Sequence, residues 1–133
     1  MIVADTNLIA YLLIRGQHTG EAEAVYRKDP QWSAPLLWRS EFRNVLVFYL
    51  HRGLMGIDAA LETMEQAQQL MWGQEFEVES SRVLRLAAHA GCPAYDCEFV
   101  ALAEDLNVPL VTSDRALIAE FKPTVVSMRA FCA

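Results

Sequence analysis

Short apolar segments alternate with longer amphipathic segments along the chain, and this alternation limits the folds available to it. The apolar segments predict strands at residues 1–4, 31–34, 76–78, 108–111 and 125–127. The amphipathic segments predict helices at residues 8–14, 19–27, 35–51, 58–72, 80–90, 95–106 and 115–121. Strands separated by helices indicate crossover connections and a mostly parallel sheet with helices on its faces. The pattern therefore predicts an α/β fold.

The length of 133 residues corresponds to one domain, residues 1–133, with a single continuous core. Hydrophobic residues make up 53% of the chain, which is a high share for so small a domain. Some apolar surface is therefore expected to contact another chain, as a dimer or with a protein partner. No apolar run approaches the roughly 18–20 residues that a membrane-spanning helix needs, so no membrane association is expected.

The N-terminus and the cysteines favour the cytoplasm. The first residues contain no basic segment, and Asp5 interrupts the only apolar stretch there, so no signal peptide is expected. The three cysteines, Cys92, Cys97 and Cys132, are odd in number and lack metal-binding spacing. We therefore predict free, buried thiols in a reducing compartment.

Four acidic residues lie where this architecture places its chemistry. Asp5 follows the first apolar segment and Asp114 follows a later one, and open parallel sheets bind ligands beyond the carboxyl ends of their strands. Glu41 and Asp96 lie beside the apolar stripes of predicted helices, where a carboxylate must be paired, hydrogen-bonded or bound to a metal. Each acid alone has a structural interpretation, as a helix N-cap or as a favourable charge in a first helical turn. The set of four favours a common site.

The chemistry of such a set is that of a hard cation. Carboxylates without His or Cys ligands beside them suit Mg²⁺ or Mn²⁺ and do not suit Zn²⁺. In sites of this kind the cations activate water, neutralise a scissile phosphate and stabilise the leaving oxygen. We therefore expect Asp5, Glu41, Asp96 and Asp114 to be the metal ligands and catalytic residues of a phosphodiester hydrolase.

The net charge of the chain is unusual for a protein that binds nucleic acid. Its formal value is −6, whereas a general nucleic-acid binder is basic. Divalent cations bound to the acids would reverse the local sign. Arg39, Arg43, Arg52 and Arg115 lie near two of the acids in sequence. They either contact phosphates or are ordinary solvated helix charges.

Four segments of the sequence together resemble the PIN-domain family. They are residues 2–7 (Ile-Val-Ala-Asp-Thr-Asn), 40–46, 94–103 and 110–114. Their order and spacing are most similar to the VapC-type toxins of bacterial and archaeal toxin–antitoxin systems. The resemblance implies a three-layer α/β/α sandwich that cleaves RNA with Mg²⁺ or Mn²⁺, usually as a homodimer. It also implies a cognate antitoxin that blocks the acidic groove, often with a segment that carries a basic residue.

The resemblance also implies roles for individual residues. The four acids above occupy the acidic positions of the family. Asn7 and Thr112 match polar residues that orient the first and the last of these acids. Glu98 matches an acid found in some members only, so its role as a ligand stays open.

Three alternatives have less support in the sequence. A phosphotransferase of the haloacid dehalogenase type also begins with a strand and an aspartate, but Asn7 stands where its second acid belongs. A receiver-like regulatory domain needs an acid pair beside the first strand and a lysine at a late strand end, whereas Lys122 follows a predicted helix. A catalytically inactive PIN-like module could bind RNA or protein, although clustered negative charge opposes phosphate.

Overall fold

A five-stranded parallel sheet forms the centre of the protein, in a computed structural model that describes residues 1–133. The strands are β1 (Ile2–Ala4), β2 (Trp32–Pro35), β3 (Glu75–Phe76), β4 (Leu110–Val111) and β5 (Val125–Val126). They lie in the order β3-β2-β1-β4-β5, and each neighbouring pair is parallel. Strand β1 lies at the centre, with β2 and β3 on one side of it and β4 and β5 on the other. The direction of the strand order therefore changes at β1, and open parallel sheets bind ligands beyond the carboxyl end of such a strand.

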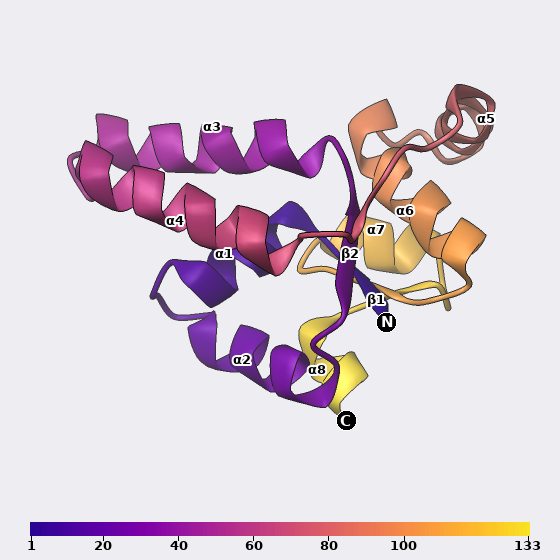
Figure 1. The fold of residues 1–133 in the computed structure, drawn as a ribbon. Coiled ribbons are helices and arrows are strands. Elements are labelled where there is room, and N and C mark those ends of the chain that lie inside the picture. Colours follow the sequence, from indigo (N-terminus) through magenta and orange to yellow (C-terminus); the bar gives the residue numbers. More distant parts are fainter.

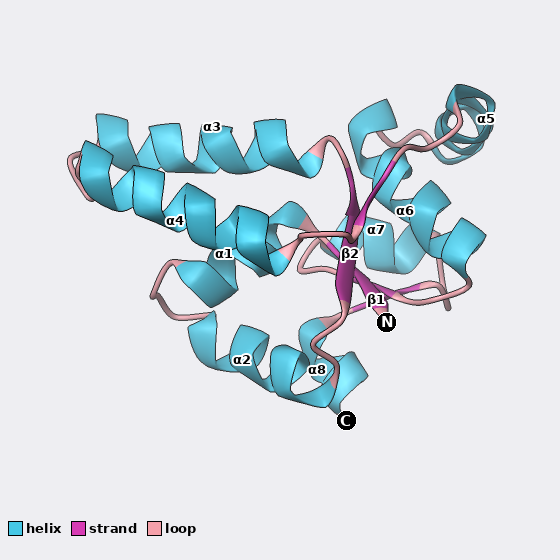
Figure 2. Ribbon diagram, viewed as in Figure 1, coloured by secondary structure: helices cyan, strands magenta, loops and turns pink.

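Helices cover the sheet on two sides, which confirms the predicted α/β/α sandwich (Figure 1). They are α1 (Thr6–Leu13), α2 (Thr19–Lys28), α3 (Trp38–His51), α4 (Ile57–Leu70), α5 (Ser80–Ala90), α6 (Ala94–Leu106), α7 (Arg115–Glu120) and α8 (Met128–Cys132). Helices α1 to α4 lie on one side of the strands and α5 to α7 on the other (Figures 1 and 2). No helix combines the length and the apolar character required to cross a membrane.

The core follows from the sheet topology. Every residue of β1 is fully buried, because a central parallel strand is covered on both faces and therefore has a continuous apolar sequence. Helix α6 packs on β1 and β2 and buries six residues. Helix α3 contributes Trp38 and Phe42, which are both fully buried and pack edge to face with ring centroids 5.9 Å apart. The carboxyl end of β1 is therefore held by a close-packed core.

Several boundaries differ from the sequence predictions. The helix predicted from Pro35 begins at Trp38, because Pro35 ends β2 and lies opposite Phe76 of β3. The C-terminal helix α8 was not predicted, because its five residues are too few to show helical periodicity. The helices predicted at 80–90 and 95–106 end as expected, and each is followed by a residue with a left-handed backbone, Gly91 with φ of 71° and Asn107 with φ of 55°. The prediction of buried thiols is wrong for Cys132, which is exposed.

Candidate functional site

The carboxyl ends of β1 and β4 bring Asp5 and Thr112 together. These two strands are neighbours in register, with Ala4 opposite Val111. The residue after each strand therefore lies at the same edge of the sheet. The Thr112 hydroxyl donates to Asp5 Oδ2 at 2.5 Å and accepts from the backbone N–H of Asp114 at 3.1 Å. One buried threonine thus connects the two acids that follow the strands.

Asp5 and Asp114 are also helix N-caps, in agreement with the structural interpretation of each acid alone. Asp5 Oδ1 accepts from the backbone N–H of Thr6 at 2.7 Å at the start of α1. Asp114 Oδ1 accepts from the backbone N–H groups of Ala116 and Leu117 at 2.9 and 3.1 Å at the start of α7. Capping uses only one oxygen of Asp114, so its second oxygen is free for another ligand. The capping role and a role in a site are therefore compatible.

Thr6 connects Glu41 to the same group, and this role was not predicted from the sequence. Glu41 lies in the first turn of α3, and its Oε1 accepts from the Thr6 hydroxyl at 2.7 Å. Thr6 is only 4% exposed, so this hydrogen bond is held inside the protein. An unbroken chain of hydrogen bonds now runs from Glu41 through Thr6, Asp5 and Thr112 to the backbone of Asp114. The position of Thr6 directly after Asp5 is the only sequence signal that could have identified it.

Asp96 and Glu98 lie at the start of α6, and both are half-buried. Neither carboxylate has a hydrogen-bond or ion-pair partner within the protein. Burial raises the pKa of Asp96, and the nearby charge of Asp114 raises it further. Burial also raises the pKa of Glu98. Asp5 and Glu41 each accept a hydrogen bond from a threonine hydroxyl. The carboxylates of Asp96 and Glu98 accept none and are therefore free to accept a ligand.

The pKa values of Asp5 and Glu41 show that the acids form one electrostatic group. Burial raises the pKa of Asp5, hydrogen bonds from Thr112 and Thr6 lower it, and the charges of Asp96 and Asp114 raise it. Burial also raises the pKa of Glu41, against the hydrogen bond from Thr6, with a further rise from the charges of Asp5, Asp96 and Glu98. A raised carboxyl pKa means that the folded protein disfavours the ionised form.

The donor chemistry of the group fits a hard cation. Its side chains offer carboxylate and hydroxyl oxygens, and no Lys, Arg or His forms an ion pair with any of the acids. No three acidic, histidine or cysteine side chains lie close enough to surround one ion by themselves. Mg²⁺ normally keeps several waters and takes phosphate oxygens as further ligands, so it needs few protein ligands. The residues present therefore fit Mg²⁺ or Mn²⁺ in a partly hydrated state.

The other residues singled out in the sequence lie in different surroundings. Asn7 is exposed and makes no hydrogen bond to Asp5, whose partners are Thr6 and Thr112. Arg39 forms a two-pronged ion pair with Glu75, at 2.5 and 2.7 Å, which leaves it engaged on the protein. Arg43 and Arg115 are exposed and have no ion-pair partner.

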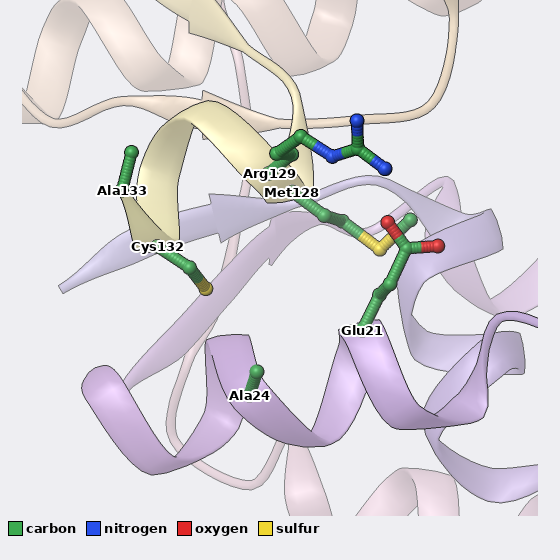
Figure 3. Close-up of a pocket in the computed structure, with 6 residues that line it drawn as sticks. All are labelled: Glu21, Ala24, Met128, Arg129, Cys132 and Ala133. Carbon is green, nitrogen blue, oxygen red and sulfur yellow. The ribbon is translucent and has the colours of Figure 1, made fainter.

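A large cavity of the molecule lies apart from these acids. It has a volume of about 390 Å³ and lies between α2 and α8, where Glu21 and Ala24 face Met128, Arg129, Cys132 and Ala133 (Figure 3). None of the residues predicted for the site lines it. The candidate site is therefore the acidic end of the sheet.

Comparison with known proteins gives this arrangement a family context. Residues 2–121 match the model of the PIN domain. A curated protein from Pyrobaculum aerophilum, ribonuclease VapC3, is 30% identical over 129 residues, which are 93% of this chain and 97% of that protein.

Solved structures share the fold at lower sequence identity. The crystal structure of PAE2754 from Pyrobaculum aerophilum has a TM-score of 0.77 at 20% identity and covers 98% of this chain and 85% of its own. The FitAcB structure from Neisseria gonorrhoeae has a TM-score of 0.73 at 19% identity, over 97% and 99% of the two chains. A toxin–antitoxin complex from Klebsiella pneumoniae has a TM-score of 0.70 at 20% identity, over 96% and 98%.

Proposed function

Because the chain belongs to the PIN domain family, we propose that it is an endoribonuclease, the toxin of a toxin–antitoxin system, and that it cuts RNA with Mg²⁺ or Mn²⁺. One observation carries this proposal. Asp5, Glu41 and Asp96 have raised pKa values, lie within one electrostatic group and have no protein cation to balance them. A cation bound from solution would favour the ionised forms of such a group. The name of the curated relative, ribonuclease VapC3, supports an RNA substrate.

The proposed ligands are Asp5, Glu41, Asp96 and Asp114, which would hold a hydrated cation partly through its waters, because no three of them lie close enough to surround an ion by themselves. A bound divalent cation supplies charge neutralisation at the scissile phosphate and at the leaving oxygen. The protein's own contribution is to hold the carboxylates in place before the RNA arrives. Thr112 and Thr6 do this by donating to Asp5 and Glu41. Asp96 makes no hydrogen bond within the protein, so both of its carboxylate oxygens are free to accept a ligand.

Two arginines are proposed to contact the RNA backbone. Arg115 follows Asp114 directly, and Arg43 lies two residues beyond Glu41 on α3. Both are exposed and unpaired, so their guanidinium groups are available to phosphates. We do not propose this role for Arg39, because its guanidinium group forms an ion pair with Glu75. A role for Glu98 as a further ligand is retained, because its carboxylate faces no competing partner.

We propose two protein partners and a location. The similar fold from Klebsiella pneumoniae is that of a toxin–antitoxin complex, which supports an antitoxin for this chain. A homodimer is supported by apolar side chains exposed around the α3–α4 hairpin, namely Val47, Phe48, Leu54, Ile57 and Leu61. Sedimentation of the protein alone, beside Leu61→Lys, tests that dimer. The RNA substrate and the three free thiols favour the cytoplasm.

Cleavage of a mixed single-stranded RNA pool with Mn²⁺ tests the function. Wild type, Asp96→Asn and an EDTA control are compared, with mock-purified protein to exclude contaminating nuclease. Cutting by wild type that disappears in the other two supports the proposal. No cutting by folded, Mn²⁺-loaded protein across several RNA pools would overturn it in favour of a catalytically inactive module that binds RNA or protein.

A further inference from the structure

A smaller cavity lies between α1, the segment that joins α1 to α2, and α3. Its volume is about 190 Å³. The side chains that define its chemistry are Asn7 and Tyr11 of α1, Gln17 and His18 of the joining segment, and Val45 and Tyr49 of α3. Asn7 and Gln17 are exposed, so the cavity is open to solvent on that side. The function described above does not use it.

The cavity borders the acidic group in two directions. Asn7 lies two residues after Asp5, on the first turn of the helix that Asp5 caps. The Tyr11 hydroxyl lies 3.2 Å from the hydroxyl of Ser113, which immediately precedes Asp114. The wall of the cavity is therefore connected to both acids that follow strands.

The wall of the cavity is aromatic and amide-bearing, and its His18 Nδ1 lies 3.2 Å from Oε1 of Glu21, which is outside the lining. The rings of Tyr11 and His18 lie with centroids 4.6 Å apart, and Tyr49 lies on the α3 side. The amide of Gln17 lies 3.2 Å from His18 Nε2, while the amide of Asn7 makes no hydrogen bond within the protein. None of the lining residues is Lys, Arg, Asp or Glu. Such a wall favours an uncharged, planar ligand over a phosphate or a cation.

The size of the cavity is suited to one aromatic ring system. A dry protein cavity of about 150 Å³ holds one benzene molecule, so about 190 Å³ leaves room for a ring with amino or keto groups. Unstacked RNA bases bind proteins by stacking on aromatic side chains and by hydrogen bonding at their edges. An amide such as Asn7 both donates and accepts, which matches the edge of a base.

We propose that this cavity is a subsite for one base of the RNA, next to the phosphate that is cut. The proposal rests on the ribonuclease function proposed above and adds a positional preference to it. The phosphate would lie at the acids, and the neighbouring base would turn into the cavity against Tyr49 and Asn7. The enzyme then depends on the base at one position beside the cut, and depends less on bases elsewhere.

Abasic substitution tests the subsite. A single-stranded RNA that the wild type cuts is mapped, then synthesised with one abasic ribose at each of three positions on either side of the cut. We expect kcat/KM to fall about tenfold or more at one position adjacent to the cut, because stacking of a base on an aromatic side chain contributes about 1–3 kcal/mol. Tyr49→Leu is expected to lose a similar factor on the intact RNA and nothing more on that abasic RNA.

The matched control is Tyr26→Leu, which removes a tyrosine of α2 that packs on Trp32 outside the cavity. It should keep the full sensitivity to the abasic site. If Tyr49→Leu unfolds, Asn7→Ala tests the same wall with a smaller change. Equal cutting of all abasic RNAs by wild type would overturn the subsite while leaving the ribonuclease intact. An unchanged abasic penalty in the cavity variants would do the same. Absence of cutting of any RNA would instead overturn the proposed function, and the subsite with it.

Discussion

Helix α3 borders two sets of carboxylates, Glu75 on one side and the acidic group with Glu41 on the other, and their pKa values shift in opposite directions. At its first turn, Trp38 and Arg39 both donate to Glu75 of β3, with distances of 2.5 to 2.8 Å. In the same turn, Glu41 accepts a hydrogen bond from Thr6 and lies near the other acids. Hydrogen bonding to Arg39 holds the pKa of Glu75 below its usual value, whereas burial raises the pKa of Glu41.

The contrast separates a carboxylate whose charge is balanced within the fold from carboxylates that have no cation beside them in the protein. Glu75 has its cation within the protein, so its charge is balanced when the chain folds. Asp5 and Glu41 accept hydrogen bonds from hydroxyls, Asp96 accepts none, and all three lie near other acids, so no cation within the protein balances their charges. Perturbed acids without an internal partner are typical of functional sites. A substitution in one group can therefore be measured against a matched substitution in the other.

The largest difference is expected in RNA cutting. Asp5→Asn should lower kcat/KM about 100-fold or more, because it removes one charge from the group proposed to bind the cation at the scissile phosphate. Glu75→Gln should leave kcat/KM within about twofold, because Glu75 belongs to the other group. Single-turnover cleavage of one mapped RNA measures both. Loss of cutting in Glu75→Gln at unchanged stability would show that the Arg39 pair belongs to the site after all.

Metal should stabilise the folded protein through the acidic group alone. At a free Mn²⁺ concentration of about 100 Kd, binding to the native state should add about 2.7 kcal/mol to the free energy of unfolding. Urea unfolding with and without Mn²⁺ measures this gain. Asp96→Asn should lose most of it, and Glu75→Gln should retain it. A gain that is equal in all three proteins would mean that the ion binds elsewhere.

A smaller effect on RNA cutting is expected when a hydrogen-bond donor to an acid is removed and the acid itself is kept. Thr6→Val keeps the shape of the side chain and deletes the hydroxyl that orients Glu41. Cutting should fall about tenfold, since a hydrogen bond to a charged group contributes about 1.5–3 kcal/mol, and Mn²⁺ should bind more weakly in calorimetry. Thr6→Ser restores a hydroxyl and should recover most of both. Recovery in neither would mean that Thr6 acts only by packing.

The acids that follow strands are easier to predict from the sequence than their partners. Asp5 and Asp114 can be identified because an apolar strand precedes each, and the parallel register of β1 and β4 then brings them to one edge. Thr6 escapes prediction because its hydroxyl acceptor, Glu41, is 35 residues away. The pairing of Arg39 with Glu75 also escapes prediction, because the two residues are 36 positions apart and pairing of that kind leaves no local pattern.

The layers of the fold can be predicted because they depend on local sequence patterns, whereas the hydrogen-bond and ion-pair partners of the acids depend on residues far apart in the chain. Helical periodicity and apolar runs are local properties, so the parallel sheet and most helices follow from them. The start of α3 at Trp38 depends on the pairing of Pro35 with Phe76 across two strands, which no window of the sequence contains. The pairing of charges and the ends of helices are therefore tertiary properties, and they also decide which carboxylates remain free.

The smallest effect is the pH dependence of the metal-free protein, and here the two groups should differ in sign. The raised pKa of Asp5 means that its ionisation opposes folding, so this cost appears as the pH rises above the usual value of 3.8 through the raised pKa. In EDTA, Asp5→Asn should therefore be more stable than wild type at pH 7, because asparagine still caps α1 without the charge. That advantage should shrink as the pH is lowered towards 4.

The lowered pKa of Glu75 works in the opposite direction. Its ionised form stabilises the fold above the usual value of 4.5, and this contribution is lost as the pH falls through the lowered pKa. Glu75→Gln should therefore be less stable than wild type at pH 7, and the deficit should diminish on acidification. Urea titrations of the three proteins in EDTA between pH 4 and 7 measure both differences. If both substitutions destabilised the protein at pH 7, the charge of Asp5 would be balanced within the fold like that of Glu75, and the acidic group would not need an external cation.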